Sequence, residues 1–309
     1  MASSVKGAFG RQQVDPILAK DQLQGLQHIL KAWGPEYLCS AFLWILTKFA
    51  SDVGGGEVSR IVPFSWNRIQ RHLYGRLWNN NRLLKARQAG FTTFFVLVRL
   101  LLPIVTEGGK AGMLVSQNSR YATQHFMMVR RAYRLFGAVD PYDNNQNALC
   151  VSLKNNLLHT AYSNRKELVF DYLDSKLIVE SAEVEEAGQG VTIQHLVCSE
   201  VARWPGDPES TMSNLLGALT PGGTRDEEST ANGAAGYYYE QYLRSMDNEV
   251  LADARSHFYG WWWSDEYVSE LTPVQEAELL ADLTSDEIAL IRKIHSELED
   301  VAYAPGAAA

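Results

Sequence analysis

Residues 83–93 combine residue types and spacing that suit the binding of phosphate. They read Leu-Leu-Lys-Ala-Arg-Gln-Ala-Gly-Phe-Thr-Thr and lead into the apolar run 94–102, which predicts a short strand, a glycine turn and a buried helix. Backbone N–H groups at such a helix start face an anion, and a hydroxyl there can hold Mg²⁺. The usual pattern Gly-x4-Gly-Lys-Ser/Thr is broken, because Ala86 replaces the first glycine and Phe91 the lysine. Taken alone, the segment also fits an ordinary strand–turn–helix.

A second polar site follows the apolar segment 193–198, which ends in Ser199 and Glu200. Sheets of α/β proteins place their chemistry at such strand ends. Glu200 suits the orientation of an attacking water, whereas Ser199 stands where a metal-holding Asp is usual. A surface acid after a core strand is the alternative interpretation.

Two further segments carry polar groups at useful places. The strand predicted at 224–229 ends in the hydroxyls of Ser229 and Thr230, which can sense a γ-phosphate; the alternative is a simple turn. Gln70 precedes the glycine loop by about one helix and one strand, and its amide can read both the donor and the acceptor edge of adenine. A surface amide is the alternative there.

Charge is unevenly distributed behind the net value of −8. Residues 60–135 hold 13 Lys or Arg and a single acid, Glu107, whereas residues 136–309 hold 10 basic and 30 acidic residues. A basic segment that contains a phosphate loop suits a polyanion: a nucleotide, DNA or both. The alternative is that these arginines form solvated helix faces paired with the acidic half.

Length and composition favour one large α/β domain with appendages, since 46% of the 309 residues are hydrophobic. Three cysteines, odd in number and far apart, predict neither a metal cluster nor a disulfide framework, and so favour a reducing cytoplasm. The longest apolar stretch, 94–105, contains Arg99 and Pro103 and is too short to span a membrane.

The predicted elements alternate between strands and helices, which favours a mainly parallel sheet with helices on both faces. Two helices are expected in 14–50, the first capped by Asp21 and separated from the second, which runs through Phe49, by a break at Gly34. The other expected helices are 68–78, 92–102, 121–136, 208–219, 235–246 and much of 272–299, and the expected strands are 83–84, 112–116, 168–170, 176–180, 193–198 and 224–229.

In this order, the segments resemble the ATPase domain of the phage terminase large subunit, the DNA-packaging motor. The resemblance runs from about residue 36 to about residue 292. It rests on five motifs: Leu-Lys-Ala-Arg-Gln-x-Gly-Phe-Thr-Thr at 84–93; Pro63, Phe64, Asn67 and Gln70; Leu196, Ser199, Glu200, Ala202 and Trp204; Glu-Ser-Thr-x-Asn-Gly at 228–233; and the aromatic stretch 261–267.

The resemblance implies an α/β fold of the P-loop NTPase kind, additional-strand and RecA-like. It has a mainly parallel central sheet flanked by helices, N-terminal helices and an acidic helical C-terminal tail. The domains expected are an N-terminal helical region at 1–58, the ATPase domain at 59–270 and the tail at 271–309, the start of a linker to a nuclease domain absent from this chain. We therefore expect no nuclease activity from this chain.

The resemblance also implies a nucleotide site. Gln70 would contact adenine, and Gly90 with the N–H groups of Thr92 and Thr93 would cradle the β-phosphate, with Gln88 in the same binding loop. Thr92 Oγ would coordinate Mg²⁺.

The catalytic groups follow in the same way. Phe91 leaves the lysine position empty, so Lys85 or Arg87 would supply the cation, and Arg87 is favoured. Glu200 would orient the hydrolytic water, and Ser199 would hold Mg²⁺ directly or through a water.

Two further features concern coupling and rate. Ser229 and Thr230 would couple hydrolysis to motion of the DNA-gripping surface. Relatives often read Gly-Arg-Gly where this chain has Gly-Gln-Gly at 188–190, so a charge-neutralising arginine comes from elsewhere or hydrolysis is slow. Such an arginine is worth about 10³-fold or more in rate.

The function implied is ATP hydrolysis, with ATP and Mg²⁺ as cofactors, that drives double-stranded DNA into a procapsid. Partners would be DNA, the small terminase subunit, the portal protein and like subunits in a ring, in the cytoplasm of an infected bacterial host and without a membrane. One alternative is a helicase-like translocase, which would need further motifs and a second motor domain. The other is a truncated or decayed terminase that binds DNA or procapsid without turnover.

Overall fold

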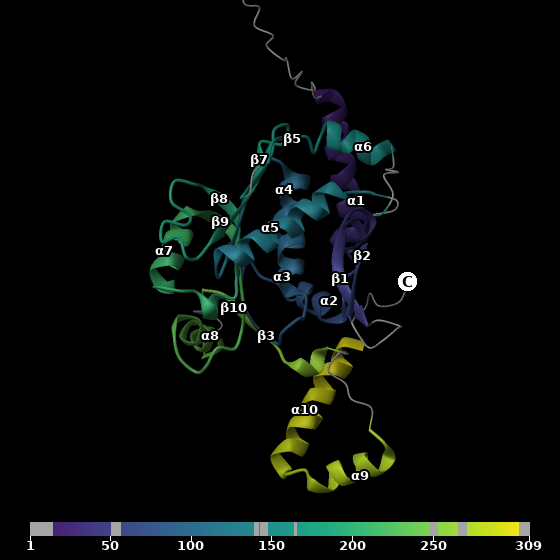
Figure 1. The fold of residues 1–309 in the computed structure, drawn as a ribbon, viewed down its shortest axis with the longest axis vertical. Helices are drawn as coiled ribbons and strands as arrows, with labels where there is room; N and C mark the ends of the chain where they lie inside the picture. The colour runs from purple at the N-terminus through teal and green to yellow at the C-terminus, as the bar shows by residue number, and fades with distance from the viewer. Residues whose placement is uncertain are drawn as a thin grey trace, which may run out of the picture.

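The protein, described here by a computed structural model, has a central sheet with helices on both faces (Figure 1). The structure describes residues 15–50, 57–138, 142, 148–163, 166–247, 253–264 and 271–302. One core cluster joins the sheet to α1 (Pro16–Phe42) and to the helical segment 91–107, and a second joins its other face to α7 (Pro208–Ala218). The sheet is thus buried on both sides, as expected of parallel strands.

Strand order identifies the fold class. The eight-stranded sheet runs β10-β3-β9-β8-β4-β7-β6-β5, and the six strands from β10 to β7 are mutually parallel. Here β9 lies between β3, which leads into the glycine loop, and β8, which ends at Ser199. An extra strand between these two is the mark of an additional-strand P-loop fold, so the predicted fold class is confirmed. The strands are β3 (Asn80–Lys85), β4 (Ala111–Ser116), β5 (Thr160–Ser163), β6 (Glu167–Phe170), β7 (Ser175–Ser181), β8 (Ile193–Ser199), β9 (Leu219–Thr230) and β10 (Arg255–Tyr259).

The helical segment after the loop is longer than predicted. It consists of α3 (Phe91–Phe94), the π-helical turn η1 (Phe95–Leu101) and α4 (Leu102–Glu107). Pro103 has no N–H to continue the α-helical pattern at this point. Gly112 on β4 lets the helix approach the sheet, because a Cβ there would lie 2.9 Å from Ile104 Cδ1.

The N-terminal region departs from the prediction in two places. Asp15, not Asp21, caps α1, and its Oδ1 accepts hydrogen bonds from the N–H groups of Ile17 (3.0 Å) and Leu18 (3.2 Å). The predicted break is confirmed, since Gly34 has φ 79° inside the kinked α1.

The helix predicted from Pro35 through Phe49 is confirmed only as far as Phe42, where α1 ends. The residues that follow form β1 (Trp44–Ala50), which pairs antiparallel with β2 (Glu57–Pro63). The apolar spacing fitted a helix locally, but backbone pairing with a segment beyond the predicted loop decides the strand. This hairpin crosses the boundary expected near residue 58, and the division into three domains stays a prediction.

The remaining elements follow the predicted order, with additions. Residues 168–180 form the expected hairpin of β6 and β7. A short helix at 148–155 and the strands β5 and β10 were not predicted. The other helices are α2 (Arg68–Tyr74), α5 (Ser119–Arg134), α6 (Ala148–Asn155), η2 (Val201–Arg203), α8 (Tyr237–Asp247), η3 (Trp261–Trp263), α9 (Pro273–Asp282) and α10 (Ser285–Ala302), the last two extending away from the sheet (Figure 1).

Strand β9 buries an ionic network inside the sheet. Arg82 on β3 donates two hydrogen bonds to the Glu227 carboxylate, at 2.9 Å and 3.1 Å, and both side chains are fully buried. Arg99 Nε, from η1, lies 2.8 Å from Asp226 Oδ2, and Arg225 Nη2 lies 2.6 Å from Asp253 Oδ2. A buried charge is tolerated only with such partners, so these pairs tie β9 to β3 and to the helix.

Glu227→Gln is expected to destabilise the fold by about 3–5 kcal/mol, because it removes the buried counter-charge of Arg82 and Arg225 and leaves them the exposed Asp253. Urea unfolding followed by circular dichroism measures the change. Arg71→Ala is the control: its pair with Glu36 is exposed, and its loss is expected to cost less than about 1 kcal/mol. Equal costs for the two substitutions would contradict the role given to the buried pair.

Candidate functional site

The predicted site residues gather at the carboxyl ends of three adjacent parallel strands. Lys85 ends β3, Ser199 ends β8 and Thr230 ends β9. The loop 86–90 continues from β3 into α3, whose first turn holds Thr92 and Thr93. Tertiary pairing thus brings together groups that lie far apart in the sequence.

The glycine loop is fixed by the segment before it. Gly90 has φ 73°, in the left-handed region, and a Cβ there would lie 2.9 Å from Gln70 Nε2. The buried Gln70 amide donates to the Gly90 carbonyl (3.0 Å), and its Oε1 accepts from the N–H of Asn67 (3.0 Å). Gln70 therefore braces the loop, and its contact with adenine stays a prediction.

Phe91 does not point toward the space above the loop. Its side chain is buried and packs near Tyr259 (ring centroids 5.0 Å apart) and Phe95 (6.5 Å). The position where a lysine is usual serves the core in this chain, so a cation at the site has to come from another residue.

That cation is Lys85, which lies between two carboxylates. Its Nζ is 3.0 Å from Glu200 Oε1 and 2.9 Å from Glu228 Oε2. Glu228 Oε1 also accepts hydrogen bonds from Thr92 Oγ1 and Ser199 Oγ, both at 2.7 Å. Lys85, Thr92 and Ser199 thus converge on Glu228, a residue that the sequence analysis did not assign to the site, and Glu200 joins them through Lys85.

The charges of this cluster stabilise one another. Burial alone would raise the pKa of Glu200, but the Lys85 ammonium and the hydrogen bonds from Thr230 hold it below its usual value. Burial likewise opposes the charge of Lys85, and the carboxylates of Glu228 and Glu200 raise its pKa nonetheless. Glu200 and Lys85 are therefore both ionised at neutral pH.

Glu200 is also held by the end of β9. Its backbone has φ 55°, and its Oε2 accepts from the Thr230 N–H (3.2 Å) and from Thr230 Oγ1 (2.8 Å). A positive φ at a non-glycine residue is strained and persists where the surroundings impose it. The carboxylate is thereby fixed at the edge of the sheet.

The other predicted residues lie at the margin of this cluster. Arg87 and Gln88 are exposed in the loop, where Gln88 has φ 59°, and Thr93 is half-buried in the first helical turn. Ser229 Oγ donates to the Thr230 carbonyl (2.9 Å) and accepts from the Ala202 N–H (3.1 Å). Ser229 thus binds backbone beside η2 rather than joining the charged groups.

Besides Glu228, two neighbours were missed. Arg203 Nε lies 3.7 Å from Glu200 Oε2 and 3.4 Å from Thr230 Oγ1. His125 Nδ1 is 2.8 Å from Ser116 Oγ, and burial lowers its pKa despite the nearby carboxylates. Arg203 could have been suspected from its place three residues after Glu200, but no local signal marks His125.

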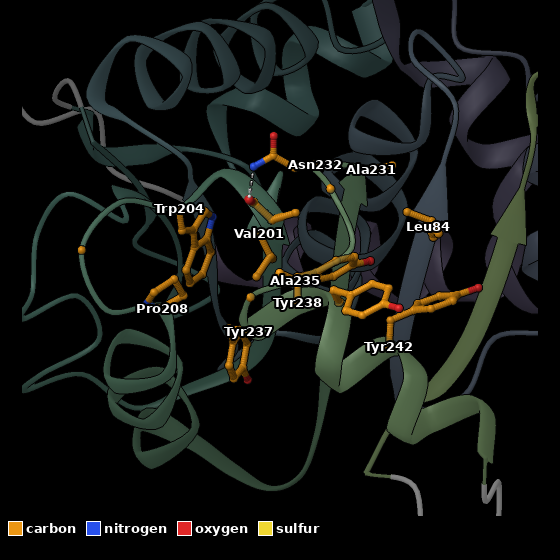
Figure 2. A pocket seen from close by; sticks show the side chains of 15 residues that line it. Leu84, Val201, Trp204, Pro208, Ala231, Asn232, Ala235, Tyr237, Tyr238 and Tyr242 are labelled. Carbon is orange, nitrogen blue, oxygen red and sulfur yellow. Dashed lines mark hydrogen bonds between the residues drawn. The ribbon is translucent and has the colours of Figure 1, made fainter.

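A cavity of about 520 Å³ lies next to this cluster (Figure 2). None of its lining residues belongs to the predicted site, although chain neighbours of Lys85, Glu200 and Thr230 do line it. Asn232 Nδ2 donates to the Ala202 carbonyl (2.8 Å) across one edge. The labelled lining is largely aromatic and apolar: Leu84, Val201, Trp204, Pro208, Ala231, Asn232, Ala235, Tyr237, Tyr238 and Tyr242.

Two features are absent from the described residues. No group of three or more His, Cys, Asp or Glu side chains there is arranged to hold a metal ion. No helix there is both long and apolar enough to cross a membrane.

The fold has solved counterparts among phage large terminases. The structure of the HK97 bacteriophage large terminase matches 85% of this chain at 13% identity and a TM-score of 0.52; the chain spans 51% of that protein's length. The large terminase ATPase domain of Thermus phage P74-26 matches 65% of this chain and 82% of its own, at 15% identity and a TM-score of 0.45. No protein-family model and no curated protein sequence matches. The fold is therefore similar to that of the HK97 large terminase, and the expected resemblance holds at the level of the fold.

Lys85→Met is expected to cost about 3 kcal/mol of unfolding free energy at pH 7.5, because Glu200 and Glu228 lose the cation between them. The cost should shrink at pH 5. Without the ammonium, burial and a neighbouring carboxylate raise the pKa of Glu200, and a group with a raised folded pKa gains stability as pH falls. In the wild type the lowered pKa of Glu200 has the opposite effect, a loss of stability toward acid.

Urea titrations at the two pH values measure both effects. Lys110→Met, which breaks an exposed pair with Glu107, is the control, expected to change stability by less than about 1 kcal/mol at either pH. A Lys85→Met cost that is the same at both pH values would show that the charges of this cluster do not govern stability.

Proposed function

We propose that this chain is an Mg²⁺-dependent ATPase, the motor domain of a viral DNA-packaging terminase. The observation that carries the proposal is the convergence of Lys85, Thr92 and Glu200 beside a glycine loop at a helix start. A cation, a hydroxyl and a water-orienting carboxylate are the groups that phosphoryl transfer requires. The match in fold to large terminases supports the choice of family.

The phosphates of ATP fit the loop and the first turn of α3. The N–H groups of Gly90, Thr92 and Thr93 face this end of the helix, where the helix dipole favours an anion. The hydroxyls of Thr92 and Ser199 would hold Mg²⁺, which neutralises phosphate charge when it is bound. Both hydroxyls bind one buried carboxylate, and this oxygen-rich donor set fits a hard cation.

Lys85, rather than Arg87, is the better partner for the γ-phosphate. It ends the strand that leads into the loop, and its ammonium already lies among the catalytic groups, whereas Arg87 is exposed. On nucleotide binding the ammonium would turn from Glu200 toward the phosphate. Glu200 would then be free to orient the attacking water and accept its proton.

Hydrolysis would be coupled to movement through Glu200 and Thr230. Glu200 Oε2 accepts two hydrogen bonds from Thr230, so a shift of this carboxylate would displace the end of β9. The chain then runs through 231–236, which line the aromatic cavity, into α8. Thr230 would therefore act as the sensor, and Ser229 would anchor the same strand end to η2.

Double-stranded DNA is the proposed track, and the basic segment 60–135 supports it. Arg130, Arg131 and Arg134 on α5 line one groove with Lys154 of α6, and such a cationic surface attracts a phosphate backbone. A ring of like subunits, the small subunit and the portal would be the partners, in the cytoplasm of an infected bacterium. The domain division at residues 58 and 270 belongs to the same proposal.

A binding-only protein is the second candidate. Phe91 and Ser199 replace the usual lysine and aspartate, and Gln189 stands where relatives often carry an arginine. Retained ATP binding without turnover would favour this candidate over the motor.

Glu200→Gln tests the proposal. It should keep ATP binding and lower the DNA-stimulated hydrolysis rate by about 10²–10⁴-fold, because the water loses its base. Phosphate release with and without double-stranded DNA is the measurement, with Glu209→Gln, an exposed acid on α7, as the matched control. A wild-type protein that binds ATP but never turns over, even with DNA, small subunit and procapsid, would refute the motor.

A further inference from the structure

Glu228 binds both hydroxyls that would hold Mg²⁺, but the function proposed above assigns this carboxylate no role of its own. Glu228 is fully buried on β9, two residues before the strand ends, and it pairs in register with Ser199 on β8 and with Leu83 on β3. Neighbours in register on parallel strands direct their side chains to the same face of the sheet. For Glu228 this is the face covered by α3 and η1, where the loop begins its helix.

The Glu228 carboxylate binds the two hydroxyls of the site, those of Thr92 and Ser199. Its Oε1 accepts from both Thr92 Oγ1 and Ser199 Oγ at 2.7 Å. Within the described residues, no group donates a well-directed hydrogen bond to its other oxygen, Oε2. That atom instead contacts the ammonium of Lys85 at 2.9 Å, so a positive charge already stands beside it.

Lys85 is the cation that contacts Glu228 in the described part of the chain. Glu200 shares Lys85 but has a second basic neighbour, Arg203, whose Nε lies 3.7 Å from Glu200 Oε2. A buried carboxylate without a counter-charge is costly. When Lys85 turns toward a phosphate, Glu228 needs another cation, and a divalent ion that also binds the phosphate fits that need.

We propose that Glu228 is the acidic residue of the metal site. From the neighbouring strand β9, it replaces the aspartate that is usual at the position of Ser199. This inference rests on the proposed function. Carboxylate and hydroxyl oxygens are ligands that Mg²⁺ takes, usually with only one or two carboxylates and with waters and substrate phosphates completing the shell. Ser199, whose hydroxyl donates to Glu228 Oε1, then also orients this carboxylate.

The test uses Mn²⁺ as the probe in place of Mg²⁺. Electron paramagnetic resonance measures Mn²⁺ binding to the full chain in the presence of a non-hydrolysable ATP analogue. Glu228→Gln keeps the shape of the side chain but removes its charge. It should weaken Mn²⁺ binding by about tenfold or more, since mutation of even a residue that only supports a metal ligand lowers metal affinity by that much. Analogue binding measured in EDTA should stay within about twofold of the wild type, because the substitution removes a contact to the metal rather than to the phosphates.

A rescue separates a ligand from a merely structural residue. Adding Ser199→Asp to Glu228→Gln returns a carboxylate to the site from β8 and should restore Mn²⁺ binding. Glu200→Gln is the matched control, since it changes the other carboxylate of the cluster and should leave Mn²⁺ binding intact. Wild-type Mn²⁺ affinity in Glu228→Gln, or an equal loss in Glu200→Gln, would overturn the assignment.

If Glu228→Gln fails to fold, a second variant tests the same placement of the metal site. Ser199→Asp alone places two carboxylates side by side, so its thermal midpoint should fall without metal and recover when Mn²⁺ and the analogue are added. An unchanged midpoint in both conditions would overturn the placement. A wild-type chain that binds no nucleotide refutes the proposed function itself, whereas Mn²⁺-dependent binding that survives Glu228→Gln refutes this inference alone.

Discussion

The position of Lys85 between the carboxylates of Glu200 and Glu228 is the interaction on which the site depends. It joins the ends of β3, β8 and β9, three strands that are distant in sequence. Like charges at such close range would repel one another without the ammonium. The same contact leaves a cation next to the glycine loop, although Phe91 fills the position where a lysine is usual.

The middle strand β9 carries this arrangement. Its inner residues Arg225, Asp226, Glu227 and Glu228 are all buried, in a place where apolar residues are the rule. Ionic partners from β3, η1 and the segment near Asp253 hold the first three. Ion pairs thus hold one part of the strand in place, and its carboxyl end positions Glu228 and Thr230 at the candidate site.

Two groups of residues lie next to each other at the carboxyl ends of the central strands. On the face of α3 and η1 lie the loop, the hydroxyls of Thr92 and Ser199 and the charged cluster. Beside it, the segment after Thr230 lines a cavity rich in tyrosines and leads to α8. The hydrogen bonds between Glu200 and Thr230 connect the two.

The sequence alone determined the fold class, most of the strands and helices and the candidate residues at three strand ends, because apolar periodicity, glycine turns and polar strand ends are local signals. It misjudged residues 44–50 as helix, since only pairing with β2 makes them a strand. It left the cation as Lys85 or Arg87 and passed over Glu228, because which side chains meet depends on strand order and register. Only the tertiary structure, by placing β9 between β3 and β8, brought that carboxylate to the hydroxyls and the ammonium.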